Sequence, residues 1–440
     1  MGKEYFHSVM LNKSKCKGCI NCIKRCPTEA IRVRQGKAKI IKERCIDCGE
    51  CIRVCPYNAK KAFTDPIDKM FDYKYKIALP APSLYGQFNK IDDINIILNG
   101  LKYIGFDDVF EVARAAEIVT IASIDLMYQN KLTWPIISSA CPAVVRLIRA
   151  RFPNLIPNVL PILAPVDVAA RIAKKEAAQK SGLDPKEIGV FFISPCPAKV
   201  TSIRDPIGQT RVDVDGVFSM SEIYMRLAPI MSKIQPTENL VKAGVKGVGW
   251  ANNGGEAYAL NQDEYIAVDG IHNVIKVLEG LDNDQFDGVK FVEAGACIGG
   301  CVGGPLTVEN GFVAETKIKK LTKHLSNYNM ETQLPEIGLD DVLWESELKY
   351  TSIMKLDDDM VVAMRKMEQM DKIANGLPKL DCGSCGAPSC RALAEDIVRG
   401  FGREMDCIYK LRERVHELAK EMVVLEETLM APYRDGPDGR

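Results

Sequence analysis

The sequence predicts a mixed α/β protein that has a cysteine-rich module at each end and finishes in an amphipathic helix. Its 16 cysteines fall into three groups along 440 residues. Strand-like apolar runs alternate with helical patterns between the two outer groups. With 47% hydrophobic residues, the chain is long enough for two to four domains that need no disulfides to fold. We therefore expect the cysteines to bind metal.

The charge balance excludes some classes of partner. Lys plus Arg and Asp plus Glu each total 58, so the net charge gives no reason to expect a nucleic-acid partner. No run approaches the roughly 18 apolar residues of a membrane span, and no apolar segment of a secretion signal opens the chain. We expect a cytoplasmic protein, without membrane or nucleic-acid binding, whose thiols stay reduced.

The first group of cysteines repeats the spacing C-x2-C-x2-C-x3-C-P. Its members are Cys16, Cys19, Cys22, Cys26, Cys45, Cys48, Cys51 and Cys55. The repeat is typical of two 4Fe-4S clusters that exchange their fourth ligands. One cluster would use Cys16, Cys19, Cys22 and Cys55, and the other Cys45, Cys48, Cys51 and Cys26. Zinc is the alternative, but it does not call for a crossed double run. Residues 1–70 are therefore predicted to form a ferredoxin-like domain.

The last group reads C-x2-C-x4-C-x16-C and consists of Cys382, Cys385, Cys390 and Cys407. Four thiolates suit either zinc or a 4Fe-4S cluster. The segment between the last two cysteines has helical character and could return Cys407 to the other three. The pattern C-G-x-C-G-x-P-x-C resembles the small 4Fe-4S domains of corrinoid iron-sulfur proteins, which favours a cluster domain over residues 378–407.

The four central cysteines are Cys141, Cys196, Cys297 and Cys301. The strand-like runs IGVFFIS (188–194) and VKFVEAG (289–295) lead directly to two of the sites. Sites on open α/β sheets form at the ends of such strands, so we expect the thiols there.

Three segments around these cysteines resemble the signatures of FeFe-hydrogenases. They are IISSACPAVVR (136–146), ISPCPAKV (193–200) and EAGACIGGCVGGP (293–305). The resemblance implies a two-lobed α/β H-cluster domain over residues 75–345 that interconverts H2 with protons and electrons. It implies that Cys141, Cys196, Cys297 and Cys301 hold an H-cluster. There, Cys301 would bridge a 4Fe-4S cluster to a di-iron subsite bearing CO, cyanide and azadithiolate. The cofactors would then be three 4Fe-4S clusters and one H-cluster.

The resemblance also assigns two side chains to the cyanide ligands. A buried cyanide needs hydrogen-bond donors. Lys199 matches the family lysine that faces one cyanide, and Ser83 in Ala81-Pro82-Ser83 matches the serine beside the other. The alternatives are a surface lysine and a simple turn serine.

The sequence departs from the family pattern where protons would move. Ala140 stands where the family has a proton-relay cysteine, and alanine cannot transfer a proton. Ser194 and Gly295 replace two methionines, and Ile121 and Ala122 stand where relay carboxylates are expected. Losing a relay costs roughly 10²–10⁴-fold in rate. The pattern resembles the slow, sensory FeFe-hydrogenases.

Two other functions remain open. A relay through Ser138, Ser139, Ser194 or water would restore a conventional ferredoxin-linked catalytic hydrogenase. A non-catalytic relative would keep only cubane clusters for electron transfer or cluster assembly. The resemblance implies H2 and protons as substrates, a ferredoxin-like or other redox partner and dedicated H-cluster maturases.

The C-terminal part is predicted to be a helical linker over 346–377 and a coiled-coil-like helix over 408–434. Apolar residues of that last helix recur at spacings of 3 and 4, at Ile408, Leu411, Val415, Leu418, Met422, Leu425 and Leu429. This helix could pack on the core of its own chain. The narrow apolar seam, however, favours contact with a second copy in a homodimer or with a signalling partner. None of the histidines, His7, His272, His324 and His416, is assigned as a ligand.

Overall fold

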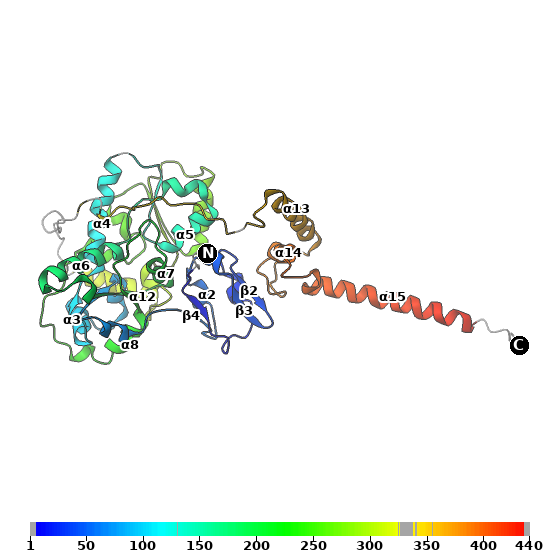
Figure 1. Ribbon diagram of the computed structural model, residues 1–440, viewed down its shortest axis with the longest axis horizontal. Coiled ribbons are helices and arrows are strands. Elements are labelled where there is room, and N and C mark those ends of the chain that lie inside the picture. Colours follow the sequence, from blue (N-terminus) through cyan, green and yellow to red (C-terminus); the bar gives the residue numbers. More distant parts are fainter. Residues whose placement is uncertain are drawn as a thin grey trace. The chain divides into compact units, whose positions relative to one another are not determined.

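The structure, a computed structural model, describes residues 6–129, 131–323, 325, 338, 341–353 and 355–434, with side chains up to residue 429. The chain divides into two compact units (Figure 1). The larger unit holds residues 1–12 and 45–353, and the smaller unit holds residues 13–44 and 354–440. The predicted ferredoxin-like segment is thus divided, since residues 13–44 belong with the C-terminal part. His324 lies outside the described residues.

A four-stranded parallel sheet forms the first half of the larger unit. Its strands lie in the order β6 (Asp108–Val109), β5 (Tyr75–Pro80), β8 (Ile188–Ser194) and β9 (Gly216–Ser219). Every residue of β8 is buried, as expected of a central parallel strand that is covered on both faces. The predicted strand 188–194 is therefore confirmed residue by residue.

A three-stranded parallel sheet forms the second half. Its order is β10 (Tyr265–Asp269), β11 (Phe291–Gly295) and β7 (Ile136–Ile137). The strand predicted over 289–295 is confirmed from Phe291 onward. Because the strands within each sheet are parallel, their carboxyl ends share one edge, where α/β proteins place their sites.

Helices connect and cover these sheets. They are α2 (Glu50–Arg53), α3 (Ile94–Tyr103), α4 (Val112–Tyr128), α5 (Pro142–Arg151), α6 (Pro165–Ser181), α7 (Pro197–Arg204), α8 (Met220–Leu227), α9 (Val245–Gly249), α10 (Gly255–Ala259), α11 (Ile271–Asp282) and α12 (Gly311–Thr322). Helix α6 packs on β8 and on α4. A short antiparallel pair, β1 (Val9–Leu11) with β4 (Lys60–Ala62), completes the unit.

The smaller unit combines two distant parts of the sequence. Helix α1 (Asn21–Lys24) and the hairpin β2 (Ile31–Arg34) and β3 (Lys37–Ile40) come from the N-terminal part. Helices α13 (Met360–Gly376), α14 (Cys390–Val398) and α15 (Ile408–Arg434) come from the C-terminal part. Only the second half of the predicted linker 346–377 is helical, beginning at Met360.

The helical character expected between Cys390 and Cys407 is confirmed only in part. Helix α14 ends at Val398, and Gly400 follows with φ +77°. A glycine in this left-handed conformation commonly terminates a helix. A single 3-10 turn, Glu404–Asp406, then leads to Cys407.

Helix α15 spans the same residues as the predicted terminal helix, and its apolar seam is exposed. The exposed fractions of Val415 and Met422 are 57% and 72%. Among the described residues, no helix is both long and apolar enough to span a bilayer.

Phe191 gives a test of the core of the larger unit. Its ring is fully buried and stacks on Phe218, with centroids 5.1 Å apart. We expect Phe191→Ala to lower the free energy of unfolding by about 3–5 kcal/mol because a cavity remains, measured as a lowered urea midpoint. Phe312, which is 65% exposed, is the control; Phe312→Ala should change stability by about 0.5 kcal/mol or less. Equal losses in the two variants would contradict this core.

Candidate metal centre

The four central cysteines line one cavity in the larger unit. Cys141 follows β7 and caps α5, and Cys196 follows β8 and caps α7. Cys297 and Cys301 lie in the loop after β11. The fold therefore brings together three segments that lie 55 and 101 positions apart in the sequence, at Cys141, Cys196 and Cys297.

Both capping cysteines are followed by proline at the first helical position. Proline suits that position because it needs no amide donor and its φ is already helical. Pro142 opens α5 and Pro197 opens α7. The amino ends of both helices, which carry partial positive charge, therefore begin at metal-ligating residue types.

Burial favours the protonated form of three of these thiols, Cys196, Cys297 and Cys301. Burial raises the pKa of Cys196 to about 12 and raises the pKa values of Cys297 and Cys301 above the ordinary value. Metal binding would have to release these protons, which couples cluster assembly to deprotonation.

Lys199 brings positive charge into the same cavity. Its Nζ donates a hydrogen bond to the carbonyl oxygen of Ala140 at 3.0 Å. Burial opposes its charge, but the thiolate forms of Cys301, Cys196 and Cys141 together raise the pKa of Lys199 above its ordinary value. The lysine therefore stays charged and can compensate a negative metal cluster.

Two further polar atoms in the cavity have no hydrogen-bond partner among the described residues. They are Ser83 Oγ, which is fully buried, and Asn252 Oδ1. Ser83 lies in the 3-10 turn Pro82–Gln87 that follows β5. An unpartnered buried hydroxyl is costly, so Ser83 fits a site whose ligand carries an acceptor, as metal-bound cyanide does.

Gly300 and Gly304 let the loop of the third segment approach its neighbours. A Cβ on Gly300, where φ is +81°, would lie 2.7 Å from Asn253 N. A Cβ on Gly304 would lie 2.4 Å from Pro195 O. Larger residues at these positions would push Cys301 away from Cys196. The two glycines therefore allow these cysteines to lie close together.

Two buried carboxyls in the cavity wall were missed by sequence reasoning. Glu256 accepts a hydrogen bond from Ser138 Oγ, which itself accepts one from Ala140 N at 3.2 Å. Burial raises the pKa of Glu256, and the carboxylate of Glu293 raises it further. Burial also raises the pKa of Glu293, although the amides of Gly254 and Ala257 oppose that rise.

Both carboxyls can therefore hold a proton near neutral pH, beside the position of the missing relay cysteine. Glu293 opens the third signature segment and could have been noticed there. Glu256 lies in a sequence that carries no signal. Of the serines considered as relays, Ser138 lines the cavity, whereas Ser139 donates to Ile162 O and Ser194 donates to Cys196 O.

The second ferredoxin-type run of cysteines, from Cys45 to Cys55, lies against this cavity within the larger unit. Arg53 Nη2 donates to Gly303 O at 2.8 Å. Burial opposes the charge of Arg53, but the thiolates of Cys297 and Cys48 help to raise its pKa. Cys48 packs against the same apolar core as Cys141 and Cys196. A cluster at the second run would be adjacent to the cavity.

His7, which was not assigned as a ligand, lies beside the predicted ligand Cys45. Its Nδ1, Cys45 Sγ and a carboxylate oxygen of Asp47 lie within 4.8 Å of one another. Asp47 accepts hydrogen bonds from Ser8 N and Thr201, so this carboxylate has a structural role already.

The remaining predicted ligands lie as follows. Cys382, Cys385, Cys390 and Cys407 line one small cavity of the smaller unit, as a single four-thiolate site requires. Cys16, Cys19, Cys22 and Cys26 belong to the smaller unit, and Cys45, Cys48, Cys51 and Cys55 to the larger. Because each crossed ligand set draws on both units, it stays a prediction.

Three family models match successive parts of the chain. The family described as the iron-only hydrogenase large subunit, C-terminal domain, matches residues 74–260 and 233–305. A 4Fe-4S dicluster domain matches residues 8–56, and an Fe-S cluster family matches residues 377–409.

Individual relatives are distant. The periplasmic Fe hydrogenase large subunit of Nitratidesulfovibrio vulgaris is 29% identical over 50% of this chain and 58% of its own length. Iron hydrogenase 1 of Clostridium pasteurianum is 23% identical over 59% of this chain and 55% of its own. The chain thus spans little more than half of these curated relatives.

Two solved structures are partly similar to this chain. A solved FeFe-hydrogenase has a TM-score of 0.43, and a variant of an FeFe-hydrogenase from Chlamydomonas reinhardtii has 0.42. Each is 16% identical and covers 62% of this chain and 88% of its own length.

The fold and the cysteine sites define an iron-sulfur protein with cluster domains at both ends of a two-sheet α/β core. The hydrogenase family model matches this core, over more than half of the sequence. The chain belongs to the iron-only hydrogenase large-subunit family.

The C-terminal site can be tested by iron content. We expect Cys385→Ala to lower bound iron by the four atoms of one cluster, because a 4Fe-4S cluster needs all four thiolates. The measurement is iron and sulfide analysis of reconstituted protein. Ser384→Ala, beside it, should bind as much iron as the unaltered protein. Unchanged iron in Cys385→Ala would contradict a cluster at this site.

Proposed function

We propose that this chain is a slow FeFe-hydrogenase that interconverts H2 with protons and electrons and reports on hydrogen. The observation that carries the proposal is the single cavity that joins Cys141, Cys196, Cys297, Cys301 and Lys199. This cavity lies within the residues that match the hydrogenase family. The resident group would be an H-cluster, which supplies the metal at which hydrogen binds and is split.

The residues around the cavity would bind and orient that group. The four cysteines would hold its cubane part, with Cys301 as the bridge to the di-iron part. Lys199 and Ser83 would donate hydrogen bonds to the two cyanides, which are costly to bury without donors. The unpartnered hydroxyl of Ser83 and the charged, enclosed Lys199 support these roles.

Proton transfer would be slow because Ala140 offers no acid or base. The cavity wall holds two carboxyls, Glu256, which is linked to Ala140 N through Ser138, and Glu293. These carboxyls would exchange protons with the cavity. Their presence is the specific observation that favours the second candidate, a conventional catalytic hydrogenase with a different proton route.

Electrons would leave through the cluster of Cys45, Cys48, Cys51 and Cys26, because its run packs beside Cys297 in the larger unit. The final acceptor would be a ferredoxin-like or other redox protein. The proposal also includes assembly by dedicated maturases, and either a homodimer or a signalling partner at α15.

Restoring the relay tests the slow rate. Ala140→Cys should speed dye-coupled H2 oxidation by about 10²-fold or more, within the usual contribution of a positioned acid or base. Ser139→Cys is the matched control, since it adds a thiol one residue earlier where the side chain faces Ile162 O. A starting rate already typical of production enzymes would contradict the sensory function, and so would equal rates in the two variants.

Removing a carboxyl tests the proton route. Glu256→Gln keeps the acceptor for Ser138 but cannot exchange a proton, so we expect turnover to fall about 10²-fold at unchanged iron content. Glu117→Gln is the control, because Glu117 is also buried and accepts backbone amides of Gly244 and Gly247 elsewhere. Unchanged turnover in Glu256→Gln would remove this carboxyl from the route.

A further inference from the structure

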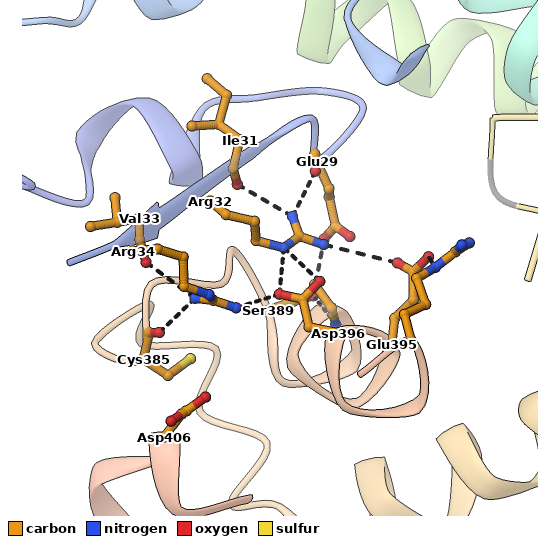
Figure 2. Close-up of polar contacts among 12 residues, drawn as sticks. Glu29, Ile31, Arg32, Val33, Arg34, Cys385, Ser389, Glu395, Asp396 and Asp406 are labelled. Carbon is orange, nitrogen blue, oxygen red and sulfur yellow. Dashed lines mark hydrogen bonds and ion pairs between the residues drawn. The ribbon is translucent and has the colours of Figure 1, made fainter. Parts of the chain in front are cut away.

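Two arginines of the N-terminal hairpin hold a carboxylate of the C-terminal cluster domain (Figure 2). Arg32 and Arg34 lie two residues apart on β2 and therefore face the same side. Arg32 Nε donates to both carboxylate oxygens of Asp396, at 3.0 and 2.8 Å, and Arg34 Nη2 donates to Oδ2 at 2.5 Å. Asp396 is 4% exposed and Arg32 5%. These partners are separated by more than 360 residues of sequence.

The neighbouring carboxylate is held in the same way. Glu395 is 6% exposed and pairs with Arg44, which is 4% exposed, and with Arg399 on its own helix. Two adjacent buried carboxylates of α14 thus depend on guanidinium groups of residues 32–44. A buried charge is strongly destabilised when its partner is removed. Separating the hairpin from α14 would therefore leave buried charges without their partners.

The loop that carries the C-terminal cysteines lies against strand β2 of the hairpin. Val33 N donates to Gly386 O at 2.8 Å, and Arg34 Nη1 donates to Cys385 O at 3.0 Å. Gly386 permits this approach, since a Cβ there would lie 2.0 Å from Val33 O.

Helix α1 makes further contacts with that loop. Lys24 Nζ donates to the carbonyl oxygens of Asp381 and Pro388. A Cβ on Gly383 would lie 3.5 Å from the side chain of Ile23, the residue after Cys22. Side chains of the two residues that follow Cys22 are therefore in contact with the loop that carries Cys382, within one compact unit.

From this packing we propose that the C-terminal cluster is the direct electron partner of the cluster predicted at Cys16, Cys19 and Cys22. Arg32, Arg34 and Asp396 are the positioning residues. In each transfer one cluster is oxidised by one electron and the other is reduced by one, with no bond or proton change. The origin of those electrons in H2 oxidation rests on the proposed function. Their acceptor beyond the C-terminal cluster would be a one-electron carrier protein.

The test uses the full-length chain reconstituted with iron and sulfide, without maturases, and reduced by dithionite. Two reference proteins each lack one cluster: Cys382→Ala/Cys385→Ala and Cys16→Ala/Cys19→Ala. Subtracting the spectrum of the first from that of the complete protein isolates the electron paramagnetic resonance signal of the C-terminal cluster. We expect that signal to be broadened by its neighbour, and to be narrow in the protein without Cys16 and Cys19. Identical signals would overturn the proposal.

Positioning is tested in the same measurement. Asp396→Asn removes the charge that orders both arginines, so the broadening should decrease while iron content is retained. Asp371→Asn is the matched control, because it breaks an exposed pair with Arg391 in the same unit, and the broadening should persist. If Asp396→Asn loses iron, Arg34→Lys is measured in its place. Lysine keeps the positive charge but cannot reach Cys385 O and Asp396 together. Broadening unchanged in Arg34→Lys would show that the network does not position the clusters.

Because no H-cluster is present in these samples, the result is independent of hydrogenase activity. A chain that lacks hydrogen turnover could still show the coupled clusters. Conversely, an active hydrogenase with two magnetically isolated clusters would overturn only this inference.

Discussion

The larger unit depends on bringing four sulfurs from three separate segments into one enclosed cavity. Parallel strands make this possible, because β7, β8 and β11 each end immediately before a ligand segment. Helices α5 and α7 then begin directly after Cys141 and Cys196. The apolar strands supply the stability, and the polar chemistry is confined to their ends.

Buried charges have different partners in the two units. In the larger unit Lys199 stays cationic among the thiols, while Glu256 and Glu293 can remain protonated. In the smaller unit the buried charges are arginines and carboxylates that fix one packing arrangement. In our proposal the first arrangement serves a metal centre, and the second holds two cluster-binding segments together.

The sequence predicted those features that depend on residues close to one another in the chain. The buried run 188–194 is β8 because an uninterrupted apolar strand fits only the centre of a parallel sheet. Ser83 and Lys199 do line the cavity with the four cysteines. The division of the first 70 residues and the pairing of Arg32 with Asp396 could not be predicted, because they depend on contacts between distant segments. Glu256 was missed for the same reason, and Gly400 shortened the helix expected before Cys407.

The most direct test of the account is the infrared spectrum of the chain after maturation. Iron-bound CO and cyanide absorb where protein does not, so their bands require the di-iron unit. The account predicts these bands in the complete protein, a change in them under H2, and their loss in Cys301→Ala. A matured protein that keeps its cubane iron but shows no CO or cyanide bands would contradict it and leave a non-catalytic iron-sulfur protein.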